Sequence, residues 1–159
     1  MIHHLSFPAI DPHHVAQVLA EIWGGKAAPF MPHPGSYMVL TLDEHGTMIE
    51  IYPLGTEMVP GLTHDQVLFS FNAFASPHSA THAAISVPTT QKQIEQIAAR
   101  EGWRCVRCDR DGFFEAIEFW VENRFMLELL PPSLATRYLT FMQPANLEQM
   151  LTQMAMQCA

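Results

Sequence analysis

The sequence has few basic residues and no long apolar runs. Lysine and arginine number 8 against 16 aspartate and glutamate residues in a chain of 159, so the formal net charge is −8. Without a basic stripe, binding to nucleic acid or to an anionic membrane is disfavoured. No apolar run reaches the length of a membrane span, and the first residues lack the basic and apolar regions of a signal peptide. We therefore expect a cytoplasmic protein.

Cysteine is also sparse, with Cys105, Cys108 and Cys158 as its only instances. A small, odd set is typical of proteins in a reducing compartment. Cys105 and Cys108 form a C-x-x-C pair within a stretch that is typical of a strand, where residues three apart point to opposite faces. A single pair in that setting favours incidental thiols over a metal or redox site.

What the sequence does contain is an internal repeat at an offset of 78 residues. Glu50 in MIEIYP falls on Glu128 in MLELLP, and each glutamate sits in an apolar run that ends on proline. A carboxylate in such a run is costly to bury without a partner. The same offset aligns His4 with His82, Ala20 with Ala98, Gly24 with Gly102, Met48 with Met126 and Pro53 with Pro131. The register indicates that one structural unit occurs twice.

The first half predicts a strand over 3–9, a helix and further strands. Asp11 is a suitable N-cap, Pro12 a suitable first helical residue, and Gly24-Gly25 a stop signal. Strands are expected at 37–42 and 47–53, whereas the Pro-rich stretch 28–35 gives no clear strand signal.

The second half predicts the same order with clearer strands. A strand over 81–87 precedes a helix that Thr89 or Thr90 can cap and that Gly102 ends. Three strands then follow at 103–109, 113–121 and 124–131.

The expected fold class is α+β, with two βαβββ modules. Residues 1–55 form the first module, 56–80 a linker with an additional strand or pocket wall at 66–74, and 81–131 the second module. Residues 132–159 form a tail with a helix capped by Asn146. Its apolar stripe favours core or homodimer packing and consists of Leu147, Met150, Leu151 and Met154.

The paired pattern resembles the vicinal oxygen chelate superfamily of glyoxalases, bleomycin resistance proteins and extradiol dioxygenases. The segments that carry the resemblance are 4–11, 48–53, 82–88 and 126–131. The resemblance implies that each module curls its sheet into a half-barrel and that one metal ion lies between two half-barrels. The ligands implied at matching positions are His4, Glu50, His82 and Glu128.

Imidazole and carboxylate ligands suit Zn, Ni, Co, Fe(II) or Mn. Such a site would bind two neighbouring oxygens of a small substrate and stabilise an enediolate, with Glu50 or Glu128 as the base. The favoured function is therefore a metal-dependent lyase or isomerase of the glyoxalase type. Strand alternation predicts pocket walls at Met48, Tyr52, Met126 and Leu130.

Other interpretations stay open. An Fe(II) ring-cleaving dioxygenase needs only two histidines and one glutamate, and a protein of this fold that sequesters a drug or metabolite needs none. The two glutamates are also compatible with exposed strand edges, and His4 and His82 with packed histidines; His3 falls on the opposite strand face. Pro8 and Leu54 replace the arginine and asparagine that hold glutathione in glyoxalase I enzymes, which disfavours glutathione thioesters.

Overall fold

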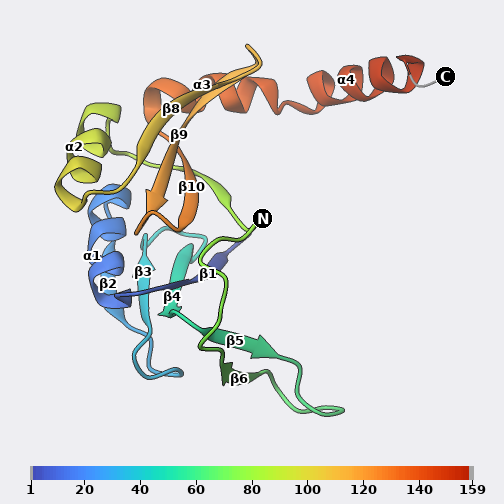
Figure 1. Cartoon of the computed structure of the whole chain (residues 1–159). Coiled ribbons are helices and arrows are strands. Elements are labelled where there is room, and N and C mark those ends of the chain that lie inside the picture. The colour runs from blue at the N-terminus through green and yellow to red at the C-terminus, as the bar shows by residue number, and fades with distance from the viewer. Residues whose placement is uncertain (1, 158–159) are drawn as a thin grey trace.

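The computed structural model describes residues 2–157 and is an α+β fold built from two βαβββ modules (Figure 1). The first module consists of β1 (His4–Ala9), α1 (Pro12–Trp23), β2 (Lys26–Pro29), β3 (Tyr37–Leu40) and β4 (Met48–Pro53). The second consists of β7 (Ala83–Ser86), α2 (Gln91–Glu101), β8 (Cys105–Arg110), β9 (Phe114–Val121) and β10 (Phe125–Leu130). Between them lies a hairpin of β5 (Thr56–Val59) and β6 (Leu68–Phe71), and the chain ends with α3 (Pro132–Phe141) and α4 (Pro144–Gln157).

The two modules repeat one topology, and their parallel strand pairs share one register. Their sheets have the strand orders β1-β4-β3-β2 and β7-β10-β9-β8, each with a parallel pair between the first and last strands. Ser6 lies opposite Glu50 in the first sheet, and Ala84 lies opposite Glu128 in the second. Both positions differ by the 78 residues of the sequence repeat. The predicted duplication of a βαβββ unit is therefore confirmed.

The helices begin and end where their capping residues dictate. Asp11 accepts a hydrogen bond from the His14 backbone N–H at 3.0 Å, and Thr90 forms a capping box with Gln93. Gly24 and Gly102 end α1 and α2 in the left-handed conformation, with φ of 65° and 68°. Glycine adopts this conformation without the steric cost of a Cβ atom.

Three elements differ from the sequence-based expectation. Strand β2 lies at Lys26–Pro29, mostly ahead of the Pro-rich stretch, whose prolines supply no N–H group to a sheet. The tail forms two helices, and α3 starts with Pro132 at a position where its missing N–H costs nothing. Helix α4 begins at Pro144 rather than after Asn146, whose side-chain amide instead donates to the Thr140 carbonyl.

Strand alternation separates the packed face of each sheet from its open face. In the first sheet, Ile49 and Ile51 are buried in the core with residues of α1, while Met48, Glu50 and Tyr52 share the opposite face. In the second, Leu127 and Leu129 join the same core. The register also places Cys105 and Cys108 on opposite faces of β8, as the sequence predicts.

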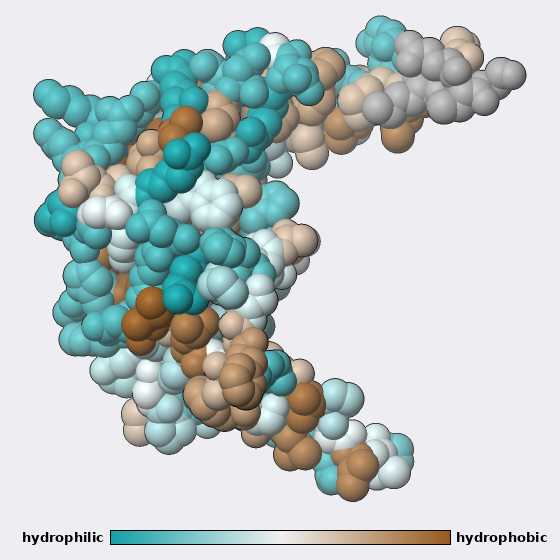
Figure 2. Space-filling view, in the orientation of Figure 1, coloured by the Kyte–Doolittle hydropathy of each residue, from teal (hydrophilic) through white to brown (hydrophobic). Residues whose placement is uncertain are grey.

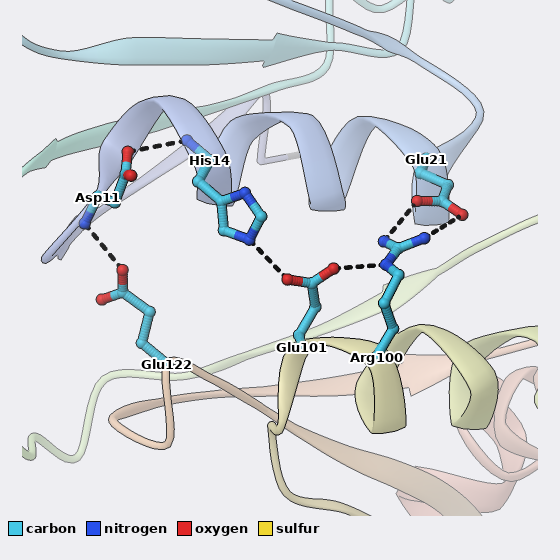
Figure 3. A network of polar contacts seen from close by, with 6 residues as sticks. All are labelled: Asp11, His14, Glu21, Arg100, Glu101 and Glu122. Carbon is cyan, nitrogen blue, oxygen red and sulfur yellow. Dashed lines mark hydrogen bonds and ion pairs between the residues drawn. The ribbon is translucent and has the colours of Figure 1, made fainter.

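A polar network joins the two modules through α1 and α2 (Figure 3). The Glu101 carboxylate contacts His14 Nε2 at 2.6 Å and accepts from Arg100 Nε at 2.6 Å, and Arg100 also binds Glu21. At the other end of α1, Glu122 accepts hydrogen bonds from the backbone N–H groups of Ile10 and Asp11.

We expect Glu101→Gln to lower the melting temperature by about 2–4 °C, because it weakens the charge-assisted contacts to Arg100 and His14. Burial alone would raise the pKa of Glu101, but hydrogen bonds from Arg100 and His14 hold it below its ordinary value. The stabilisation that Glu101 contributes is therefore fully present above the pKa of about 4.3 of an unfolded glutamate, and it is lost as the pH falls below that value. Thermal denaturation from pH 3 to 7 checks this, with exposed Glu44→Gln as the control. A difference that persists unchanged at pH 3 would contradict it.

The hairpin β5–β6 forms one arm, and α4 with the end of α3 that leads into it forms another; both extend from the same side of the body (Figure 1). The start of α3 packs on the second sheet through the buried Leu134. Figure 2 shows apolar side chains gathered along both arms. Exposed ones on the hairpin arm include Leu62, Phe71 and Phe74, and those on the helical arm include Leu139 and Leu151. The accessible surface is 9929 Å², against about 8,000 Å² for a compact monomer of this mass. No helix within residues 2–157 is long and apolar enough to span a membrane.

Candidate functional site

The four residues predicted as ligands lie on the first and last strands of the two modules or next to them. His4 begins β1 and is exposed, and His82 directly precedes β7 and is exposed. Glu50 is buried in β4, and Glu128 is half-buried in β10. Among residues 2–157, no three His, Cys, Asp or Glu side chains are close enough together to hold a metal ion. One copy of the chain does not assemble such a group, and the four-residue ligand set stays a prediction.

Glu50 is the most buried carboxylate of the first sheet, with an exposed fraction of 7%. Its Oε2 atom accepts hydrogen bonds from the Ser6 hydroxyl at 2.8 Å and from the Tyr52 hydroxyl at 3.0 Å. No donor among the described residues reaches Oε1. Two hydroxyl groups thus fix the carboxylate and leave one oxygen for a proton, a cation or a substrate hydrogen bond.

Tyr52 is held as a hydrogen-bond donor to this carboxylate. Burial and the neighbouring Glu50 charge raise the pKa of Tyr52 to about 12, so its hydroxyl stays protonated at neutral pH. The Tyr52 ring packs against His33, with ring centroids 5.1 Å apart, and against Phe69 of β6 at 5.6 Å. The hairpin therefore contributes an aromatic wall next to the Glu50 site.

The second sheet carries a different arrangement at the matching position. Glu128 lies directly opposite Glu118 of β9, and Arg110 of β8 bridges the two carboxylates. Arg110 Nε donates to Glu128 Oε1 at 3.1 Å, and its Nη2 donates to Glu118 at 3.0 Å and to Glu128. Hydrogen bonding from Arg110 is the main reason that the pKa of Glu118 falls below its ordinary value.

Because of these contacts, the two glutamates differ in how readily they can bind a divalent cation. Glu50 presents a carboxylate oxygen without a donor on the open face, which is the kind of ligand that hard cations bind. Glu128 already has its charge neutralised by Arg110, so it can join a metal only if that ion pair opens. Glu50 therefore offers one carboxylate oxygen to a divalent ion, whereas the charge of Glu128 is already paired with Arg110 in this arrangement.

Sequence reasoning did not identify Ser6, Arg110 or Glu118 as parts of these sites. The signal for Ser6 was available, because it lies two residues beyond His4 on the same strand face and opposite Glu50. The signal for Arg110 was weaker, since it depends on the registers of two consecutive hairpins.

Cavities lie along β1. One of about 160 Å³ is lined by Ser6, Phe7, Pro8, Tyr52, Thr56 and Met58, next to Glu50. A second, of about 140 Å³, includes His4 and Met48 together with Ala83 and Ala84 of the other module. Met126 and Leu130 share the open face of the second sheet with Glu128. Of the predicted pocket residues, Tyr52 contacts the Glu50 carboxylate directly, through its hydroxyl hydrogen bond.

Comparison with known proteins relates the chain to others by structure. No protein-family model matches the sequence, and no curated protein matches it. A solved structure of the fosfomycin resistance protein FosX from Listeria monocytogenes, with Mn(II) and sulfate, is 14% identical with a TM-score of 0.54, over 89% of this chain and 96% of that one. FosX from Mesorhizobium loti is also 14% identical, with a TM-score of 0.52 over 87% and 96%.

A glyoxalase family protein from Bacillus anthracis is 13% identical, with a TM-score of 0.51 over 81% of this chain and 92% of that one. At these identities the likeness concerns the fold, and it covers both βαβββ modules together with their connections. The observed topology and these neighbours agree with the resemblance carried by the segments around His4, Glu50, His82 and Glu128. The chain shares its paired βαβββ fold with these fosfomycin resistance and glyoxalase family proteins.

Proposed function

We propose that the protein is a metal-dependent enzyme of the glyoxalase type, with lyase or isomerase chemistry on a small oxygen-bearing molecule. The observation that carries the proposal is the Glu50 carboxylate, which is buried, fixed by two hydroxyl groups and left with one oxygen without a donor. The oxygen without a donor lies on the open face of the sheet, so it can bind a cation or accept a hydrogen bond from a substrate. The FosX structures that contain Mn(II) support a divalent ion in this fold.

In this proposal Glu50 is a ligand that can leave the metal, and its freed Oε1 would then remove a proton from a carbon next to a carbonyl group. Ser6 and Tyr52 orient the carboxylate so that Oε1 points to the substrate, and they remain protonated donors throughout. The Phe69 ring stacks on Tyr52 and forms an apolar wall beside the carboxylate. A bound divalent ion would supply the positive charge that stabilises the developing oxyanion.

The proposed ligands are His4, Glu50, His82 and Glu128, and the proposed metal is Zn, Ni, Co, Fe or Mn. Within one copy, Glu128 is held by Arg110. Participation of Glu128 therefore requires the Arg110 side chain to turn away. If it does not, the metal is left with His4, His82 and Glu50, which is the two-histidine, one-carboxylate set of a ring-cleaving dioxygenase. The Arg110–Glu128 pair is thus the observation that keeps the dioxygenase as the second candidate.

The test of this proposal is divalent metal binding to Glu50→Gln. We expect at least a tenfold loss of Mn(II) or Zn(II) affinity, because the amide removes the ligand charge, and a loss of turnover with it. Ser6→Ala should weaken affinity by less, since the Tyr52 hydrogen bond remains. Isothermal titration calorimetry of each variant provides the measurement, and Glu44→Gln is the matched control. Equal metal affinity for wild type and Glu50→Gln would refute the proposal, and metal binding without turnover would favour a sequestering protein.

We further propose that the protein works as a homodimer in the cytoplasm. A two-stranded hairpin and a 14-residue helix are each only marginally stable without a packing partner. All four residues of β6 are exposed, and α4 projects away from the body (Figure 1). A second copy related by a two-fold axis would bury both apolar arms at once. The tail residues predicted for this interface include the half-buried Leu147 and Met150 and the exposed Leu151, whereas the side chain of Met154 lies outside the described residues.

A further inference from the structure

A cavity of about 260 Å³ lies between the two modules, on the side of β1 that faces the second module. Its walls come from four parts of the chain. β1 contributes Ser6, Phe7 and Pro8, and Leu54 follows β4. Arg124 precedes β10 and Phe125 begins it, and the stretch before β7 contributes residues between 76 and 81. Phe7 and Phe125 stack with ring centroids 4.1 Å apart, which fixes the two modules around the cavity.

Arg124 is the exceptional residue of this cavity. Its half-buried side chain makes no hydrogen bond or ion pair with any residue from 2 to 157. By contrast, Arg100, Arg107 and Arg110 are each bound to carboxylates. In a chain of net charge −8, a guanidinium without an acidic partner at a cavity wall is available for an anion.

The neighbours of Arg124 in the cavity are suited to the same ligand. His78 and the hydroxyl groups of Ser79 and Thr81 line it, and all of them can donate hydrogen bonds. His78 also lines an adjoining cavity of about 290 Å³ together with Arg104, so two cationic side chains flank this histidine. Ser6 and Ser76 also line the cavity, and its apolar lining consists of Phe7, Pro8, Leu54, Pro77 and Phe125.

We propose that this cavity binds a small organic anion, with a carboxylate or phosphate group on Arg124 and an apolar portion against Phe7 and Phe125. A guanidinium binds both anionic groups through paired N–H donors. Ser6 lines this cavity and also donates to Glu50. On the proposed function, the anionic group would anchor a substrate whose reacting carbon lies across β1 at Glu50; the anion site itself does not depend on that function.

The experiment uses full-length protein in EDTA, so that no metal contributes to binding. Phenyl phosphate and phenylacetate are titrated by calorimetry, with inorganic phosphate and neutral benzyl alcohol as comparison ligands. We expect saturable binding of the two aromatic anions, weaker binding of phosphate and none of benzyl alcohol. Arg124→Gln should weaken the aromatic anions at least tenfold, while Lys92→Gln, which removes the same charge from an exposed position of α2, should not.

Equal binding to wild type and Arg124→Gln, or an equal loss in Lys92→Gln, would overturn the anion site. Because Arg124 makes no side-chain contact that the fold needs, an unchanged melting temperature for Arg124→Gln is also expected, and a large drop would assign the residue a structural role instead. This experiment tests the anion site independently of the proposed metal site. Glu50→Gln should keep phenylacetate binding in EDTA even where it loses metal.

Discussion

Phe71→Asp should convert a dimer of about 36 kDa, twice the chain mass of 17.9 kDa, into a monomer at micromolar concentration. Phe71 is 74% exposed at the end of β6, opposite Thr56, in a hairpin that forms a two-stranded sheet of its own. A buried aromatic residue at the centre of an interface commonly contributes 2 kcal/mol or more. Placing a charge there should therefore raise the dimer dissociation constant by about 100-fold or more.

Analytical ultracentrifugation over a range of concentrations measures this directly. Leu151→Asp tests the helical arm in the same way, and loss of dimer in both variants would show that both arms take part. Met31→Asp is the control, because Met31 is 83% exposed in the loop between β2 and β3 and belongs to neither arm. A wild type that sediments as 17.9 kDa at every concentration would contradict the homodimer.

The arms are the part of the fold that sequence reasoning anticipated least. Strand β6 pairs with β5 through Phe71 opposite Thr56 and Leu68 opposite Val59. All four residues of β6 are exposed, so there is no alternation of buried and exposed positions for a pattern to follow. The modules themselves were predictable because caps, stop glycines and apolar periodicity agree in each half. Helix α3 was missed because Pro131-Pro132 suggested only an end to the preceding strand.

The sequence predicted where the two glutamates lie in the sheets, but not which residues contact their carboxylates. The repeat located Glu50 and Glu128 on matching strands, and the structure confirms that shared register. What each carboxylate contacts depends on residues that break the repeat. Ser6 is matched by Ala84, and the place of Glu118, opposite Glu128, is taken in the first sheet by Met38, opposite Glu50. A duplicated backbone can therefore carry one carboxylate held by hydroxyl groups and another held by a cation.

Removing the Arg110 side chain should have a large effect on the stability of the second sheet. Arg110→Met leaves Glu118 and Glu128 directly opposite each other, with side chains only 20% and 13% exposed. Breaking a buried ion pair costs about 3–5 kcal/mol, and partial solvent screening reduces this here to about 2–3 kcal/mol. Arg107→Met is the matched control, because Arg107 pairs with Glu115 on the other face of β8 and is more exposed, so its loss should matter less.

The pH dependence separates charge repulsion from a simple loss of packing. In the wild type, hydrogen bonding from Arg110 lowers the pKa of Glu118, so this stabilisation holds above the unfolded value of about 4.3 and fades as pH falls below it. In Arg110→Met, two like charges raise the pKa of at least one carboxyl, so the variant should gain stability as pH falls from 7 toward 5. Urea denaturation of both proteins at pH 5 and pH 7 checks this. Adding Glu118→Gln to Arg110→Met should restore much of the loss at pH 7, and a pH-independent loss without such rescue would mean that Arg110 acts through packing alone.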